Sequence, residues 1–82
     1  MSEHNLSILA RCAHVVSTAG ADFSDTAGEL LDLLDTLSGY RSQLVARELR
    51  EALLWAVLGG PSMTLDAVQG ELAAIKRHLL GE

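Results

Sequence analysis

Aromatic residues and prolines are scarce in this chain, which has one Phe, one Tyr, one Trp and one Pro among its 82 residues. Residues that favour β-strands are sparse, whereas Leu and Ala, which favour helices, supply most of an apolar content of 49%. That apolar content excludes an intrinsically disordered segment, and the length is that of one small domain, residues 1–82. The sequence therefore predicts a single all-α domain.

Only one cysteine is present, Cys12, so no disulfide can form within the chain. The sequence begins without the basic and apolar regions of a secretory signal, which favours a cytoplasmic protein. The longest apolar run, residues 52–58, is far shorter than the roughly 18 residues that span a bilayer. We therefore expect no membrane segment, and we expect Cys12 to be a small buried side chain on the apolar side of its helix.

Basic residues are outnumbered, with six Lys and Arg against eleven Asp and Glu and a formal net charge of −5. Residues 22–37 contain no base, whereas acids and bases balance in the rest of the chain. Duplex nucleic acid requires a basic surface, so it is excluded as a partner. The predicted acidic helix face, which either attracts a basic patch on a partner protein or is simply solvated, consists of Asp25, Glu29, Asp32 and Asp35.

Glycines divide the sequence into four predicted helices, over residues 3–18, 25–37, 40–58 and 65–80. The expected N-caps are Ser2 for the first helix, either Ser24 or Thr26 for the second, and Thr64 for the fourth. Gly20 is expected to end the first helix, and the Gly-Gly-Pro sequence at residues 59–61 the third. The short connections favour a compact bundle of four short helices, with neighbouring helices near antiparallel.

Apolar residues at helical spacing predict which helix faces form the core. On the first helix they are Leu6, Leu9, Ala10, Ala13 and Val16, widened by Ile8, Cys12 and Val15. On the second helix they are Ala27, Leu30, Leu31, Leu34 and Leu37. Gly28 and Gly70 fall inside helices, where they could allow a close approach between neighbouring helices.

The third helix ends apolar on every side, in a stretch that contains Leu54, Trp55 and Leu58. A helix that is apolar all round is buried all round, and four short helices cannot easily surround one of their own number. A second copy of the chain or another protein is therefore expected to cover this end, and tryptophan is common at the centre of such interfaces. The alternative is that the first helix covers this end and that Trp55 belongs to the core.

The fourth helix carries a heptad seam that predicts a second contact with another copy. Its members are Leu65, Val68, Leu72, Ile75 and Leu79. Together with the apolar end of the third helix, this seam predicts a homo-oligomer, with Leu54, Trp55, Leu58, Leu65, Leu72, Ile75 and Leu79 as its contact residues.

No catalytic or metal-binding pattern is present, so we expect neither enzymatic activity nor a cofactor. His4 and His14 are nearly three helical turns apart, too far to hold one metal ion. The glycines at 59 and 60 lack the lysine and the preceding strand of a phosphate-binding loop. Tyr40, Arg41 and Arg47 could instead hold a small anionic ligand, although pairing of the arginines with Glu51 and the acidic helix is the alternative.

Residues 38–57 resemble the second arm of a helical hairpin in phage proteins that sequester cyclic oligonucleotide signals of bacterial defence systems, including CBASS. The matching residues are Gly39, Arg41, Leu44, Leu49, Glu51, Ala52, Trp55 and Ala56. The resemblance implies a non-catalytic homo-oligomer with nucleotide pockets between its subunits. It carries over no ligand-binding residues.

These features predict a small non-catalytic binding protein that acts through protein–protein interaction as an inhibitor or adaptor, and the resemblance implies one of the kind that phages encode against host defences. Two alternatives remain open. One is an oligomeric sponge for a cyclic nucleotide, with basic residues at the subunit boundary. The other is a structural subunit of a larger assembly.

Overall fold

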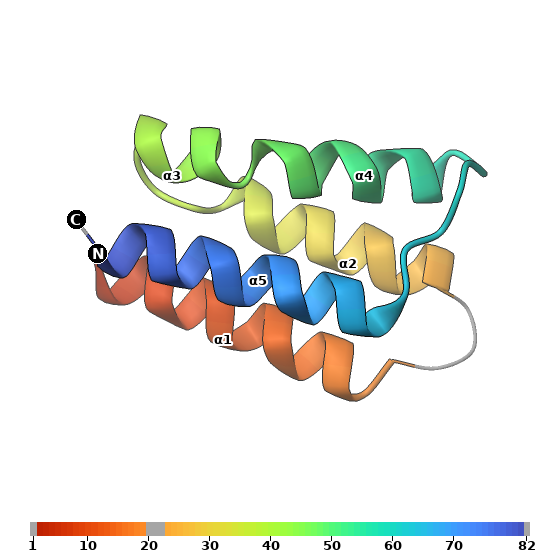
Figure 1. The fold of residues 1–82 in the computed structure, drawn as a ribbon, viewed down its shortest axis with the longest axis horizontal. Helices are drawn as coiled ribbons and strands as arrows, with labels where there is room; N and C mark the ends of the chain where they lie inside the picture. The colour runs from red at the N-terminus through yellow and green to blue at the C-terminus, as the bar shows by residue number, and fades with distance from the viewer. Residues whose placement is uncertain (1, 20–22, 82) are drawn as a thin grey trace.

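A computed structural model describes residues 2–19 and 23–81, which contain helices and connecting turns but no strand. The helices are α1 (Glu3–Ser17), α2 (Phe23–Asp35), α3 (Tyr40–Val45), α4 (Arg47–Val57) and α5 (Leu65–Leu80) (Figure 1). The all-α prediction is confirmed. Gly20, the expected end of the first helix, lies outside the described residues.

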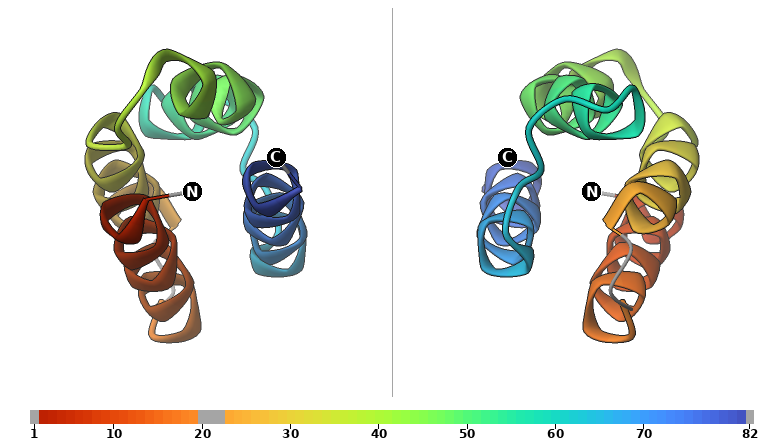
Figure 2. Two further views of the ribbon diagram at one scale, coloured as in Figure 1. Left: turned by 90° about the vertical axis from the view of Figure 1, so that its left-hand side faces the viewer. Right: turned by 90° about the vertical axis from the view of Figure 1, so that its right-hand side faces the viewer.

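The helices form an antiparallel bundle whose principal extents are 34 × 21 × 18 Å. Seen end-on, α1 and α2 lie on one side, α3 and α4 lie across the top, and α5 lies on the other side (Figure 2). α2 packs against both α1 and α4, while α5 packs against α1 and α3. Among the described residues, no helix is both long and apolar enough to cross a membrane.

The core is formed by buried apolar side chains from α1, α2, α4 and α5, together with Leu37 and Ala46, and the partly buried Val45 of α3 packs against it. On α2 the predicted core face is confirmed for Ala27, Leu30 and Leu34, which are fully buried, and Leu37 beyond its end is buried too. On α1 the buried face is rotated from the predicted stripe. It comprises Asn5, Ile8, Leu9, Cys12 and Val16, whereas Ala10 and Ala13 are exposed. The rotation follows from the packing of α1 between α2 and α5.

The prediction of one helix over residues 40–58 is wrong in one respect, because a turn at Ala46 divides it into α3 and α4. Ala46 has φ −84° and ψ −3°, and its side chain is fully buried. The turn lets α3 pack against α5 while α4 packs along α2. The part of the chain that the structure describes therefore contains five helices, of which the third is a short segment of six residues.

The second helix begins two residues before its predicted start, at Phe23, whose ring packs against the core. Ser24 and Thr26 therefore lie inside α2, and neither is its N-cap. α2 also ends earlier than predicted, at Asp35. The Gln43 side chain caps this end by donating hydrogen bonds to its last carbonyl groups. The Gln43 Nε2 atom donates hydrogen bonds to the carbonyl oxygens of Leu34, at 3.1 Å, and Leu37, at 2.8 Å.

The predicted N-caps Ser2 and Thr64 and the glycine end of the third predicted helix are confirmed. The Ser2 hydroxyl accepts the Asn5 N–H, and the Thr64 hydroxyl accepts the Ala67 N–H. α4 ends in a Schellman motif, in which Gly59 adopts a φ of +92° and the Gly60 N–H donates to the Trp55 carbonyl. The two glycines thus fix the point at which the chain leaves α4.

Gly28 and Gly70 do not mediate close helix packing, because a Cβ atom at either position would meet nothing within 4 Å.

We expect Gly70→Ala to raise the free energy of unfolding by up to about 1 kcal/mol, since it removes backbone freedom from the unfolded chain. Gly59→Ala should lower it by about 1–2 kcal/mol, because an L-residue is strained at positive φ. Urea titrations of the two variants test this pair, and destabilisation by Gly70→Ala would contradict it.

An asparagine clasp, made by Asn5, Ser38 and Ser42, joins α1 to the turn between α2 and α3. Asn5 is buried, and its Nδ2 atom donates to the Ser38 carbonyl at 3.0 Å and to the Ser42 hydroxyl at 2.9 Å. Its Oδ1 atom accepts the Ser38 N–H at 2.8 Å. The clasp therefore fixes the start of α3 against the start of α1.

Candidate protein interface

The last turns of α4 expose a group of large apolar side chains, which we call the tryptophan patch: Leu54, Trp55, Val57 and Leu58. Trp55 is 64% exposed and Leu58 is 69% exposed, whereas the neighbouring Leu53 is fully buried against the core. None of the described residues covers the patch. The alternative in which Trp55 belongs to the core is therefore wrong for this structure.

The patch is held in place by the turn that follows it. The Gly60 N–H donates to the Trp55 carbonyl at 2.6 Å, which turns the chain back alongside the indole ring. Pro61, Ser62 and Met63 line a shallow hollow together with Trp55 and Ala52, and Met63 also packs against the core. Trp55 is thus presented next to a turn that is anchored in the core.

The heptad seam on α5 does not lie on the surface. Val68, Leu72, Ile75 and Leu79 are all buried in the core of the chain itself, so Leu72, Ile75 and Leu79 are not available as contact residues. The physical reason is the small size of the domain, which needs the apolar face of α5 to close its core against α1 and α3. Only Leu65, at the start of the seam, is exposed, and it lies at the same end of the bundle as the tryptophan patch.

The acidic side chains of α2 are exposed, as predicted, but they do not all face open solvent. Asp35 lies 3.5 Å from Arg50 of α4. Asp32 lines the hollow between α2 and α4, which also contains Leu54 of the tryptophan patch. Asp25 and Glu29 have no ion-pair partner among the described residues. The acidic face therefore borders the tryptophan patch on the side of α2.

The structure does not bring Tyr40, Arg41 and Arg47 together into one anion site. Arg47 pairs with Glu51 at 3.2 Å, which confirms the predicted pair one turn apart. Arg47 also lines the hollow between α2 and α4, where acidic groups outnumber basic ones, and neither Tyr40 nor Arg41 lines that hollow. Tyr40 is 83% exposed at the start of α3. The arrangement matches the alternative in which arginines pair with neighbouring acids.

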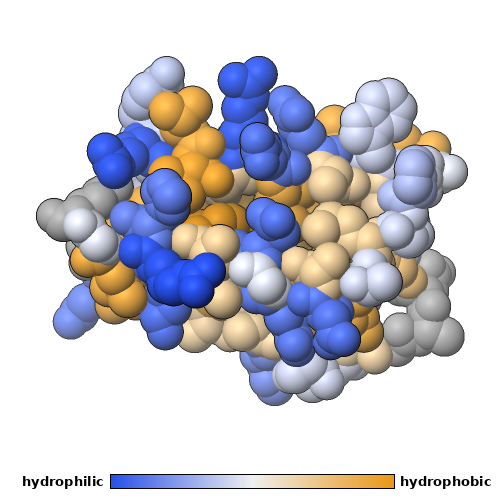
Figure 3. Space-filling view, viewed as in Figure 1, coloured by the Kyte–Doolittle hydropathy of each residue, from blue (hydrophilic) through white to orange (hydrophobic). Residues whose placement is uncertain are grey.

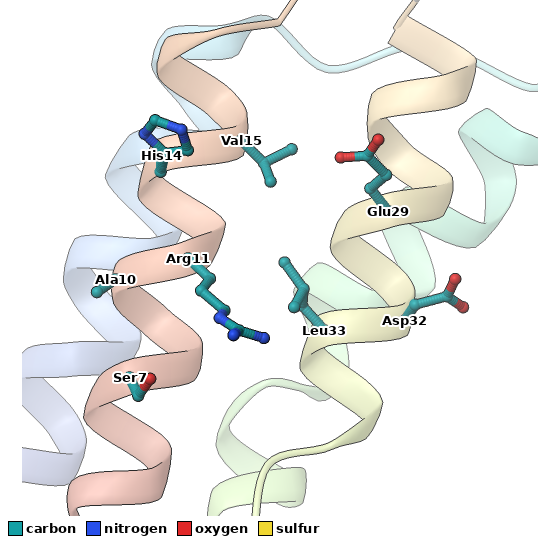
Figure 4. A pocket seen from close by; sticks show the side chains of 8 residues that line it. All are labelled: Ser7, Ala10, Arg11, His14, Val15, Glu29, Asp32 and Leu33. Atoms are coloured by element: carbon teal, nitrogen blue, oxygen red, sulfur yellow. The ribbon is translucent and has the colours of Figure 1, made fainter.

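A second surface feature is a groove of about 570 Å³ between α1 and α2 (Figure 4). Its lining residues are Ser7, Ala10, Arg11, His14, Val15, Glu29, Asp32 and Leu33. Arg11 of α1 extends towards α2, and Val15 and Leu33 lie between the two helices. Sequence reasoning missed this groove because Ser7, Arg11 and His14 form the polar stripe of α1, which is typical of a solvated face.

Cys12 is fully buried, and burial raises the pKa of its thiol to about 11. The side chain is therefore a packed apolar group with little thiolate, as predicted. Among the described residues, no group of three or more His, Cys, Asp and Glu side chains could hold a metal ion.

The raised pKa of Cys12 predicts a pH dependence of stability. The unfolded chain loses the thiol proton near the ordinary pKa of 9.0, whereas the folded chain keeps it to about 11. The unfolded state thus binds fewer protons in this range, so the free energy of unfolding should fall as the pH rises from 9 to 11. Urea titrations should show a shallower decline for Cys12→Ala than for the unchanged chain, and identical slopes would contradict the expectation.

No known protein family, no curated protein and no solved structure matches this chain. The resemblance of residues 38–57 to phage sponge proteins stays a prediction.

Proposed function

We propose that this chain is a small non-catalytic protein-interaction module, of the inhibitor or adaptor type, which binds a partner protein through the tryptophan patch. The observation that carries the proposal is the 64% exposure of the only tryptophan beside the 69% exposed Leu58. Tryptophan is enriched among residues that dominate binding energy, and contiguous exposed apolar groups mark interaction sites.

In the isolated chain, Leu54, Trp55 and Leu58 remain in contact with water. Fully burying a large apolar side chain stabilises a protein by about 1.5–3 kcal/mol, and the isolated chain forgoes part of this for Trp55, Leu54 and Leu58. A partner that covers the patch recovers it. The patch also has the layout of an interface, with apolar groups at its centre and charged groups, Asp32 and the Arg47–Glu51 pair, at the border nearest α2.

Photo-crosslinking inside the cell tests the proposal. A photoreactive amino acid placed at Leu58 should give a discrete protein adduct, which is lost when Trp55→Ala is added. The matched control is the same amino acid at Glu71, an exposed position in the middle of α5, and no adduct is expected there. Absence of any protein adduct at Leu58, either with the chain itself or with another protein, would refute the proposed function.

A further inference from the structure

The end of the bundle opposite the tryptophan patch exposes a second apolar group, which we call the tyrosine patch: Tyr40 and Leu44 on α3, and Leu80 at the end of α5. Tyr40 and Leu44 are one helical turn apart and share a face of α3. α3 and the end of α5 lie together at the end of the bundle where the chain also begins (Figure 1). The described residues therefore leave an exposed apolar patch towards each end of the long axis.

The two ends differ in charge. At the tryptophan-patch end, the first turn of α2 carries Asp25 and the first turn of α5 carries Asp66, and neither turn contains a base. At the tyrosine-patch end, α5 finishes with Lys76, Arg77 and His78. Glu3 and Asp35 also lie at the tyrosine-patch end, but Asp35 is already paired with Arg50. The tryptophan-patch end is thus apolar and acidic, and the tyrosine-patch end is apolar with a surplus of bases on α5.

We infer that the partner of the tryptophan patch is the tyrosine patch of a second copy, in a head-to-tail contact. This inference rests on the proposed function and identifies the partner protein that the tryptophan patch binds. Pairing two tryptophan patches would bring two acidic ends together and leave both tyrosine patches uncovered. The head-to-tail contact covers one patch of each copy and joins the acidic end of one copy, which carries Asp66, to the end of the next copy that carries Arg77.

A head-to-tail contact has a consequence for assembly. Because each copy keeps one unused patch after the first contact, association continues until the copies close into a ring or extend into a filament. Figure 3 views a long side of the bundle, on which hydrophilic and hydrophobic residues are interspersed, and this side takes no part in the proposed contact. The net charge of −5 on each copy opposes association at low salt, although charges more than about 8 Å apart are largely screened at physiological ionic strength.

Sedimentation velocity of two variants, measured separately and as a mixture, tests the head-to-tail contact. Leu58→Asp disables the tryptophan patch and Leu44→Asp disables the tyrosine patch. Both side chains are exposed, so the fold should survive, which circular dichroism checks. The unchanged chain should grow in mass with concentration, and each variant alone should stay a monomer. Their equimolar mixture should form a dimer and nothing larger, because only one intact pair of patches remains.

Three outcomes would overturn the inference. A mixture that stays monomeric while the unchanged chain assembles would exclude head-to-tail pairing. Dimers of Leu44→Asp alone would show that the tryptophan patch pairs with itself. An unchanged chain that stays monomeric at every concentration would exclude a second copy as partner, while the proposed function would stand if Leu58 still crosslinks to another protein.

Charge exchange between the ends gives an independent test. Asp66→Lys alone and Arg77→Glu alone should each weaken association by up to about fivefold, since an exposed pair contributes at most about a factor of five. The double variant carries the opposite charge at both ends and should regain the lost affinity. Glu71→Lys makes the same charge change in the middle of α5 and should leave association unaltered or slightly stronger. Equal weakening by Glu71→Lys would contradict end-to-end charge pairing.

Discussion

Replacing Leu53 by alanine is expected to lower the free energy of unfolding by about 2–5 kcal/mol, because it leaves a cavity in a fully packed core. Leu53 is fully buried, whereas Trp55, two residues further on, is 64% exposed. Trp55→Ala should therefore change the free energy of unfolding of the monomer by no more than about 1 kcal/mol, although it removes a larger side chain. Urea titrations at concentrations below any association measure both changes.

The pair of variants reports the orientation of α4. If α4 were rotated so that Trp55 entered the core, Trp55→Ala would be the more damaging change and Leu53→Ala would be mild. A larger destabilisation by Trp55→Ala than by Leu53→Ala would thus remove the structural basis of the tryptophan patch.

Replacing Asn5 by alanine is expected to cost about 2–3 kcal/mol, the second-largest effect. The change removes three hydrogen bonds to Ser38 and Ser42, and a buried donor or acceptor left without a partner costs about 1–3 kcal/mol. Because Ser38 is exposed, water compensates part of the loss at its backbone groups. The free energy of unfolding from urea titrations gives the magnitude.

A double-mutant cycle identifies the cause of the Asn5 effect. Ser42→Ala removes one of the three bonds and should cost about 1 kcal/mol. The two substitutions together should cost less than their sum, because they share a hydrogen bond. Ser17→Ala serves as the control, since Ser17 is exposed and its hydroxyl bonds only within α1. Additive effects at positions 5 and 42 would contradict the clasp.

The fold was predictable where local chemistry decides it. The bounds of α5 agree with the prediction at both ends, because Thr64 caps its start and its apolar spacing runs without a break to Leu79. The turn at Ala46 was not predictable, since alanine favours helix and only the packing of α3 on α5 and α4 on α2 divides the two segments. Local propensity cannot report such tertiary demands.

The candidate site was predictable in part. The apolar spacing around Trp55 indicated a helix end that the chain could not cover, and the exposed tryptophan patch agrees with that reasoning. The heptad spacing on α5 could not show whether its seam serves the core of the same chain or a partner, since both uses require the same residues. Asn5 was missed because its partners, Ser38 and Ser42, are 33 and 37 residues away in the sequence.

The fluorescence of the single tryptophan tests most directly whether the isolated chain leaves the patch in water. At concentrations where sedimentation shows a monomer, Trp55 should emit like tryptophan in water and should be readily quenched by acrylamide. As association proceeds, its emission should move to shorter wavelengths and quenching should weaken. Emission at short wavelengths with strong protection already in the monomer would show that the chain covers Trp55 itself, and it would contradict the tryptophan patch as an interface.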